Sequence, residues 1–521
     1  MPISQTDQLF RLVKSFSKAE KRNFTLYSKR IQGTDTLKFL KLFELLDKQD
    51  ELDEGAITKK LKGIDKSQLS NLKRHLYKQL VTSLRMLYIQ RDESIKIREH
   101  IDFAKILYMK GLYLQSLKIL QMARNMAIKD DQEFLLLEIT EKQKFIEARH
   151  ITRTGTTKNI DLVKASKEGV KRVSNTVLLS NLKIIIHGRY IKNGHVKNQE
   201  EYEDVKQYFE SEMPDIDMNE LSFMEKIYYH QSCVWYYYIL QDFENCYKSA
   251  HSWVDIFKGN KEKSLMRDPD LLMRGYHYVL MSAYNLRDVN NFHKYNIELD
   301  NFRSSNYSKL TINSKVLSFY YVHINRFNKH FLEGTFSEGV TIIPSTLRRI
   351  DRYSKWMDPH RTLVLYFKIG WMYFGHRNPA KAVDFLNEII NTKFGNLRED
   401  IQGYSRLLFL MCHYEMNNYD VIDYVIRSVE TFFDKMQDKN KLQKAVLLFF
   451  KSIVNKPVAE HKIHLRSLLD QLGVLKQDPF EKRAFLYLDV YNWAKSKVER
   501  TTMEELIKQE NSPRAFVSHG K

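Results

Sequence analysis

Residues 366–389 read YFKIGWMYFGHRNPAKAVDFLNEI and contain two helical stripes in succession. The first stripe holds, at relative positions i, i+3, i+4 and i+7, Tyr366, Ile369, Gly370 and Tyr373. The second stripe holds, at i, i+4 and i+7, Ala382, Leu386 and Ile389. Side chains at these intervals lie on one face of an α-helix, so each half of the stretch predicts an amphipathic helix. The two halves together predict a pair of helices joined by a short turn.

A second stretch, residues 104–123, repeats this pattern as AKILYMKGLYLQSLKILQMA. Its first helix carries Ala104 and Leu107, and its turn carries Gly111 and Tyr113. Its second helix is lined by Ser116, Leu120 and Ala123. Both stretches resemble the tetratricopeptide repeat, in which small residues let two antiparallel helices approach closely while an aromatic residue at the turn packs between them. The resemblance implies an all-α fold, a right-handed α-solenoid whose first helices line a concave binding surface.

Weaker copies of the pattern extend the resemblance over about residues 99–436. They lie at Tyr237–Cys246, Ala283–Val289, Gly334–Gly339 and Asn417–Ile422. Equivalent points of the repeats are Val234, Leu280, Phe327, Gly370 and Leu410. Their spacing is roughly 40 to 47 residues, whereas a standard tetratricopeptide repeat has about 34. We therefore expect longer helices than usual. Packing is expected to differ where the family's small or apolar residue is replaced by Trp253, Asn296 and Thr346.

Helical stripes continue outside these copies, whereas the period-two alternation of a half-buried strand is hard to find. The clearest N-terminal stripe consists of Leu69, Leu72, Leu76, Leu80 and Leu84. We expect a small N-terminal helical domain at residues 1–98, the tetratricopeptide-like array at 99–436, capping helices at 437–510 and a tail at 511–521. Between Gln132 and Met218 the repeat pattern is poorly matched.

The composition is basic and poor in cysteine. Lys+Arg 83 against Asp+Glu 64 gives a formal net charge of +19, which favours anionic partners without identifying one. The spacing of the three cysteines, Cys233, Cys246 and Cys412, matches neither a disulfide framework nor a zinc site. The N-terminal stretch lacks the apolar core of a signal peptide, and the richest apolar run is interrupted by polar residues. We therefore expect a cytoplasmic protein that is not inserted in a membrane.

Motifs of the common enzyme classes are missing from the sequence. The nearest approach to a phosphate-binding loop, Gly155-Thr-Thr-Lys158, lacks the first glycine and the closing order of that motif. His461 and His464 stand at i, i+3 and could share a metal, but a solvated helix face is the simpler interpretation. We predict that the protein is not an enzyme and has no cofactor, no metal and no identified small-molecule substrate.

Aromatic residues concentrate at residues 228–238, which read YYHQSCVWYYY. Such a run cannot be buried on one side of a helix only. Core packing, contact with a bound peptide and stacking of nucleic-acid bases all stay open for it. For peptide contact we predict Tyr237, Tyr284 and Tyr373, which occupy first-helix or turn positions of recognisable repeats.

A basic N-terminal segment carries the alternative function. Residues 56–61, Gly63 and residues 67–76 resemble a helix-turn-helix, whose second helix reads base edges while its cations contact phosphates. Against this, the apolar stripe of the second helix runs on to about Tyr88, and an acidic stretch, Asp47–Glu54, lies close by. For anion or nucleic-acid contact we predict Lys73, Arg74 and Lys78. This interpretation requires one basic face formed by Lys59, Lys60, Lys62, Lys66, Lys73, Arg74, Lys78 and Arg85.

The sequence favours a non-enzymatic scaffold or adaptor that binds a peptide or helix of a partner protein in the groove of the array. The alternative is a nucleic-acid-binding regulator or ribosome-associated protein that uses the basic N-terminal helices. The first requires polar and aromatic side chains on the first helices, whereas the second requires binding that falls steeply with salt.

Overall fold

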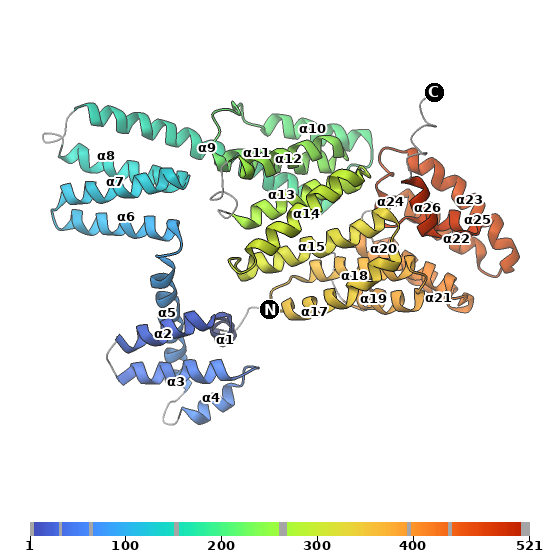
Figure 1. Cartoon of the computed structure of the whole chain (residues 1–521), viewed down its shortest axis with the longest axis horizontal. Helices are drawn as coiled ribbons and strands as arrows, with labels where there is room; N and C mark the ends of the chain where they lie inside the picture. Colours follow the sequence, from blue (N-terminus) through green and yellow to red (C-terminus); the bar gives the residue numbers. More distant parts are fainter. Residues whose placement is uncertain are drawn as a thin grey trace. The chain divides into compact units, whose positions relative to one another are not determined.

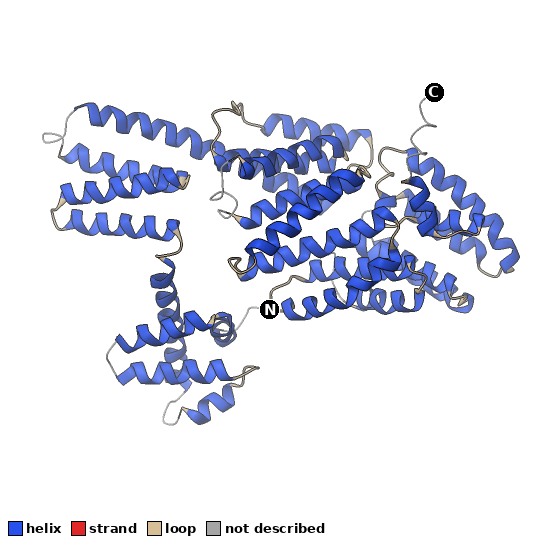
Figure 2. Ribbon diagram, viewed as in Figure 1, coloured by secondary structure: helices blue, strands red, loops and turns tan. Residues whose placement is uncertain are grey.

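The computed structural model describes residues 5–30, 34–61, 66–150, 156–259, 268–392, 398–435 and 440–511. Every regular element among these residues is a helix, so the predicted all-α class is confirmed (Figure 1, Figure 2). The chain divides into two units, Met1–Ser174 and Asn175–Lys521, and the division falls within the long helix α9 (Thr156–Asn193). The domain boundaries expected from the sequence follow the repeat pattern instead, and they stay predictions.

The first unit begins with five helices that share one core. They are α1 (Gln5–Ser15), α2 (Lys18–Arg30), α3 (Thr34–Lys48), α4 (Glu54–Lys60) and α5 (Lys66–Tyr88). The predicted leucine stripe of α5 faces this core, because Leu69, Leu76 and Leu80 are buried while Leu72 and Leu84 pack against them. Among the described residues of this bundle, α5 is the element that contacts α1, α2 and α3 alike.

Three further helices of the first unit pack in sequence: α6 (Glu93–Met109), α7 (Tyr113–Lys129) and α8 (Glu133–Arg149). Small residues lie where α6 crosses α7, since Ala104 and Ala123 are almost fully buried. The Ser116 hydroxyl of α7 donates a hydrogen bond to the Ala104 carbonyl of α6 at 2.7 Å. The predicted small positions of this pair therefore do let the two backbones approach closely.

The second unit consists mainly of helix pairs in which each helix packs against the next, as in a helical repeat (Figure 1). After α10 (Gln199–Glu212) the pairs are α11 (Phe223–Ile239) with α12 (Phe243–Lys258), α13 (Pro269–Asn285) with α14 (Val289–Asn306), α18 (Pro359–Gly375) with α19 (Pro379–Asn391), and α20 (Glu399–Glu415) with α21 (Tyr419–Lys435). The long helix α15 (Ile312–Glu333) begins the pair between α14 and α18. First helices also contact one another, α13 with α15, α15 with α18 and α18 with α20.

The same turn closes the first helix of each of these pairs. A backbone N–H bonds back to the carbonyl five residues earlier, at 2.9 to 3.0 Å, and the accepting residues are Tyr237, Ala283, His330, Tyr373 and His413. The residue before each donor has φ between 54° and 67°, as in a Schellman C-cap; these residues are Gln241, Arg287, Gly334, Arg377 and Asn417. The five equivalent points predicted from the sequence each lie three residues before the accepting carbonyl, and all five are buried. Their predicted equivalence is therefore confirmed.

The second helix of the α15 pair departs from the pattern. It is broken into α16 (Phe336–Gly339), a 3₁₀ turn (Val340–Ile342) and α17 (Ile343–Tyr353), which carries Pro344 in its first turn. A proline has no N–H to continue the preceding helix, which accounts for the break. Thr346, where a small or apolar residue was expected, is buried and its hydroxyl meets Nδ1 of His323 at 2.8 Å.

A second departure, Trp253, lies against a glycine of the neighbouring helix. Trp253 of α12 is 1% exposed, and a Cβ added at Gly275 of α13 would lie 3.0 Å from Val254 and 3.5 Å from the indole ring. The absence of a side chain at Gly275 therefore lets α12 approach α13 closely, with Val254 the nearest side chain and the tryptophan in ordinary contact.

The chain ends by returning across the turns of the pairs. After α22 (Lys441–Ile453) and α23 (Val458–Gln477) come three shorter helices, α24 (Ala484–Tyr487), α25 (Val490–Glu499) and α26 (Met503–Glu510). We call residues 480–511 the C-terminal segment. Its contacts with earlier turns are the hydrogen bonds Gln241 to the Phe480 carbonyl (3.3 Å), Tyr284 to the Leu486 carbonyl (3.3 Å), Asn511 to the Leu332 carbonyl (2.6 Å) and Trp493 to Glu415 (2.7 Å).

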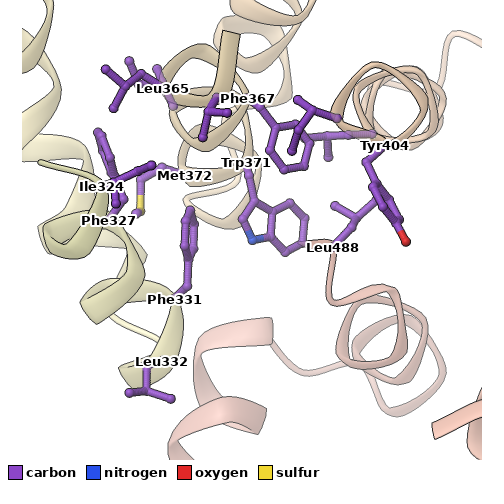
Figure 3. Close-up of a cluster of buried hydrophobic side chains, with 14 of the residues drawn as sticks. Ile324, Phe327, Phe331, Leu332, Leu365, Phe367, Trp371, Met372, Tyr404 and Leu488 are labelled. Carbon is purple, nitrogen blue, oxygen red and sulfur yellow. The ribbon is translucent and has the colours of Figure 1, made fainter. Parts of the chain in front are cut away.

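Apolar side chains pack the C-terminal segment against the earlier helix pairs. Figure 3 shows Leu488 of the C-terminal segment beside Trp371 and Tyr404, in the cluster that also holds Phe331. All four residues belong to one core that connects the helix pairs of the second unit. The described residues include no helix that combines the length and apolarity needed to cross a bilayer.

Candidate functional site

A band of aromatic rings crosses successive first helices of the second unit. Its contacts, given as distances between ring centroids, are His187–Trp235 (4.2 Å), Trp235–Tyr278 (5.5 Å), Tyr278–His277 (5.6 Å), His277–Tyr321 (4.3 Å) and Tyr321–Tyr320 (5.7 Å). These residues come in turn from α9, α11, α13 and α15. The Arg361 guanidinium of α18 lies 5.4 Å from the Tyr320 ring and extends the band to a fifth helix.

The rings of the band cover one another but leave their polar edges accessible. Tyr320 and Tyr321 are only 8% and 7% exposed. Within the described part of the chain, the hydroxyls of Tyr278, Tyr320 and Tyr321 have no hydrogen-bond partner, and none of them is buried away from solvent. The hydroxyl groups of these tyrosines are therefore left without a partner in the described part of the protein.

Five cations accompany the band, and together with it they form what we call the cation–aromatic surface. They are Lys183 (α9), Arg274 (α13), Arg361 and Lys368 (α18), and Arg398 at the start of α20. Arg361 pairs with Asp358 at 3.2 Å, and Arg398 pairs with Asp400 at 2.7 Å. Among the described residues no carboxylate lies within ion-pair distance of Lys183, Arg274 or Lys368.

Two of the unpaired cations, Lys368 and Lys183, have neutral partners instead. The Lys368 ammonium donates to Oδ1 of Asn328 at 2.7 Å and lies 5.2 Å from the Phe331 ring. The Lys183 ammonium lies 4.9 Å from the ring of Tyr228, and Arg274 is exposed. These contacts hold the side chains in place but do not neutralise their charge.

The cations act on one another's protonation. Burial, reinforced by Arg398, lowers the pKa of Lys368 to about 7. Burial and the neighbouring Arg274 lower the pKa of Lys183. His277 is neutral at physiological pH, because burial and then Lys368, Arg274 and Arg361 lower its pKa to about 3. An anion bound here would relieve this mutual repulsion.

One end of the surface already holds a carboxylate of the chain itself. Both oxygens of Asp400 accept hydrogen bonds from Arg398 at 2.7 Å, and the Tyr487 hydroxyl donates to Asp400 at 3.0 Å. Burial disfavours the charged form of Asp400, but the pairing with Arg398 outweighs it and holds the pKa of the carboxyl well below its usual range. A guanidinium, the Ile401 backbone N–H and a tyrosine hydroxyl thus together keep a carboxylate ionised at this surface.

Two further carboxylates stand at the start of α13. Asp268 caps the helix by accepting from the Leu271 N–H at 3.0 Å, and its pKa is raised chiefly by burial. Asp270 follows it in the first turn. Neither lies within ion-pair distance of a cation of the surface in the described ranges.

The three tyrosines predicted for peptide contact lie outside this band. Tyr237, Tyr284 and Tyr373 are half-buried near the ends of α11, α13 and α18. Tyr373 stacks on Phe385 at 5.8 Å, and Tyr284 donates to the Leu486 carbonyl of the C-terminal segment. They stand on three separate turns, and one of them is occupied by the chain's own C-terminus.

The basic residues predicted for anion contact lie on two sides of α5. Lys73 pairs with Glu54 of α4 at 3.1 Å, whereas Arg74 and Lys78 are exposed one turn apart. Of the wider set required for a basic face, Arg85 pairs with Asp102 at 3.2 Å, and Lys59 and Lys60 are exposed at the end of α4. Lys62, the Gly63 turn and the side chain of Lys66 lie outside the described residues.

A cavity of about 380 Å³ lies in the first unit, and its charges are balanced. It is lined by Arg85, Ile95, Arg98, Ile101, Asp102 and Glu138. The ion pair between Arg85 and Asp102 forms part of its wall. We therefore place no site there.

Sequence reasoning missed most of the cation–aromatic surface, although the repeat pattern contained the signal. In three first helices the residue nine positions before the accepting carbonyl of the turn belongs to this surface or contacts it. These residues are Tyr228, Arg274 and Tyr321, and we call their place in the helix position nine. Tyr278 and Lys368 occupy the fifth position. Positions nine and five lie one turn apart on the same face of a first helix. Comparing these two columns across the repeats would have found the surface.

Comparisons with family models, with curated proteins and with solved structures found no match to this chain.

Proposed function

We propose that the protein is a non-enzymatic scaffold or adaptor that binds a peptide or helix of a partner protein at the cation–aromatic surface. The proposal includes the finer architecture expected from the sequence, a right-handed α-solenoid of tetratricopeptide-like helix pairs. The supporting observation is the continuity of the aromatic band over α9, α11, α13 and α15, with Arg361 of α18 at its end.

The arrangement suits an extended ligand. Successive first helices present side chains at regular positions, so a chain lying across them meets polar groups on one helix after another. The helices are fixed by packing, since Leu280, Phe327 and Leu410 are fully buried beneath the surface. Binding to such a preformed surface needs little ordering of the protein, and this favours affinity.

The three cysteines support a reducing, cytoplasmic setting for this function. Cys233, Cys246 and Cys412 are all buried, and none is in a disulfide. Thiols left unpaired in this way are typical of proteins that work in reducing compartments.

Peptide display tests the proposal. The full chain would be used to select binders from a random peptide library, and each binder would then be measured against Arg274→Ala and Arg466→Ala. Arg274 belongs to the cation–aromatic surface, whereas Arg466 is an exposed residue of α23, which is not one of the helices that form the band. We expect selected peptides to lose affinity for Arg274→Ala and to keep it for Arg466→Ala. A failure to select binders, or equal affinity for both variants, would contradict the proposal.

The alternative function rests on Arg74 and Lys78, which are exposed on the same side of α5. Nucleic-acid binding there predicts that the double variant Arg74→Ala, Lys78→Ala weakens binding across sequences and lowers its dependence on salt. The pairing of Lys73 with Glu54 and of Arg85 with Asp102 reduces the charge that this face offers. For this reason we place the alternative second.

A further inference from the structure

Three cations of the cation–aromatic surface have no carboxylate within ion-pair distance among the described residues, although the charge of Arg274 acts to lower the pKa of Asp268. Lys183, Arg274 and Lys368 come from three different helices, α9, α13 and α18. In the part of the chain that the structure describes, no carboxylate pairs with them, whereas Arg361 and Arg398 each have one. Burial without a paired carboxylate is costly for Lys183 and Lys368, and a bound anion reduces that cost, whereas Arg274 is exposed.

The surface offers hydrogen-bond donors more than acceptors. Besides the three cations, the hydroxyls of Tyr278 and Tyr321 can donate, and so can the indole N–H of Trp235; all reach solvent without a partner among the described residues. Carboxylate oxygens accept such hydrogen bonds and carry the complementary charge. The internal pairing of Asp400 with Arg398 and Tyr487 shows this chemistry at one end of the same surface.

The packing of the rings distinguishes a peptide from a nucleic acid. Single-stranded nucleic acids bind aromatic side chains by stacking bases on open ring faces. Here His277 covers one face of Tyr321, with an interplanar angle of 14°, and His187 covers one face of Trp235. The edges that remain accessible suit carboxylates better than bases.

We infer that the partner of the cation–aromatic surface is an acidic peptide segment, whose Asp or Glu side chains pair with Lys183, Arg274 and Lys368. This inference rests on the proposed function and names its ligand. Carboxylates spaced along an extended chain would reach cations on successive first helices. The tyrosine hydroxyls would donate to the same carboxylates.

Lys368 provides an independent readout. Its pKa of about 7 means that the side chain is about half protonated near neutral pH in the free protein. A carboxylate beside it would favour the charged form, so binding above pH 7 would take up a proton. Calorimetry in buffers of different ionisation enthalpy measures this uptake, and Lys368→Met would abolish it.

The test uses the full chain and defined probes. Fluorescence anisotropy would compare a labelled peptide of alternating Glu and Gly with the same peptide carrying Gln in place of Glu, and with an oligouridylate of equal length. Each probe would be titrated with the natural protein, Arg274→Glu and Arg466→Glu. Both arginines are exposed, and the two substitutions change the net charge equally. A difference in affinity between the two variants therefore reports the location of the arginine, because the net charge of the protein is the same in both.

We expect the Glu peptide to bind the natural protein, with affinity reduced by about tenfold or more in Arg274→Glu and by less than about twofold in Arg466→Glu. Equal losses in the two variants would overturn the inference, because attraction would then follow net charge alone. Tighter binding of the oligouridylate, with the same dependence on Arg274, would overturn both the inference and the proposed function. Display-selected neutral peptides that bind at Arg274 would overturn the inference and leave the proposed function standing.

Discussion

At the scale of single residues, Lys368 carries a charge that the fold disfavours. Its ammonium is held by Asn328 and by the Phe331 ring, neither of which is an anion. Burial and the charge of Arg398 bring its pKa to about 7, against an ordinary lysine value of about 10.4. The neighbouring His277, with a pKa of about 3, does not titrate in this range. The consequence is a dependence of stability on pH with a definite sign.

Replacing Lys368 by Met reveals this dependence. Between about pH 7 and pH 10 the unfolded chain keeps a proton that the folded chain has released, so the stability of the natural protein rises with pH over this range. Lys368→Met lacks this contribution. We expect the variant's advantage over the natural protein to be largest near pH 7 and to shrink toward pH 10, as measured by urea unfolding. Parallel stability curves would contradict the lowered pKa.

The backbone conformation of Arg377, more than its side chain, affects the stability of the protein. It has φ of 59° in the turn that closes α18, and its side chain is exposed. A left-handed conformation costs a residue with a Cβ about 1–2 kcal/mol and costs glycine little. We expect Arg377→Gly to raise the free energy of unfolding by up to about 1 kcal/mol, and Arg377→Val to lower it by about 1 kcal/mol or more.

The control for Arg377 is an arginine in the middle of a helix. Arg466 is exposed within α23, where glycine is unfavourable by about 1 kcal/mol. Arg466→Gly should therefore destabilise the protein while Arg377→Gly stabilises it, both measured by urea unfolding. The same sign for the two substitutions would show that the turn does not strain Arg377.

At the scale of elements, the helices and their spacing were predictable while the course of the C-terminal segment was not. Periodic apolar residues indicate a helix locally, and the equivalence of Leu280 with Phe327 needed only a repeated pattern. The hydrogen bond from Asn511 to the Leu332 carbonyl joins residues 179 positions apart, and the bond from Gln241 to Phe480 joins residues 239 apart. No local periodicity encodes contacts of this kind, so the sequence indicated only capping helices here.

The close packing of α26 on the end of α15 gives a test of this segment. Gly334 has φ of 67°, and a Cβ there would lie 2.9 Å from Ile507, which is 2% exposed. We expect Ile507→Ala to lower the free energy of unfolding by about 2–4 kcal/mol and to speed amide exchange of Thr335, whose N–H bonds the His330 carbonyl. Hydrogen exchange with mass spectrometry measures the second effect.

The matched control for Ile507 is its neighbour Lys508, which is exposed on the same helix. Lys508→Ala should change stability by less than about 0.5 kcal/mol. Unchanged exchange at Thr335 in Ile507→Ala would mean that the C-terminal segment does not brace this turn.

At the scale of the whole molecule, the residues predicted from the sequence for peptide contact and those of the cation–aromatic surface differ. The sequence directed attention to first helices and turns and selected tyrosines by local resemblance to a repeat, and one of these, Tyr284, meets the chain's own Leu486 carbonyl. The residues of the band are brought together by contacts between first helices, such as α13 with α15. Arg274 and Lys368 are far apart in sequence, and their common surface follows only from the way the helices stack.

The central claim is that a peptide lies across the first helices of the second unit. The most direct measurement is photo-crosslinking of a display-selected peptide that carries one photoreactive residue, followed by mass spectrometric mapping of the adducts on the full chain. The account predicts adducts on α11, α13, α15 and α18, and their loss in Arg274→Glu. Adducts concentrated on α5, or scattered evenly over exposed helices, would contradict it.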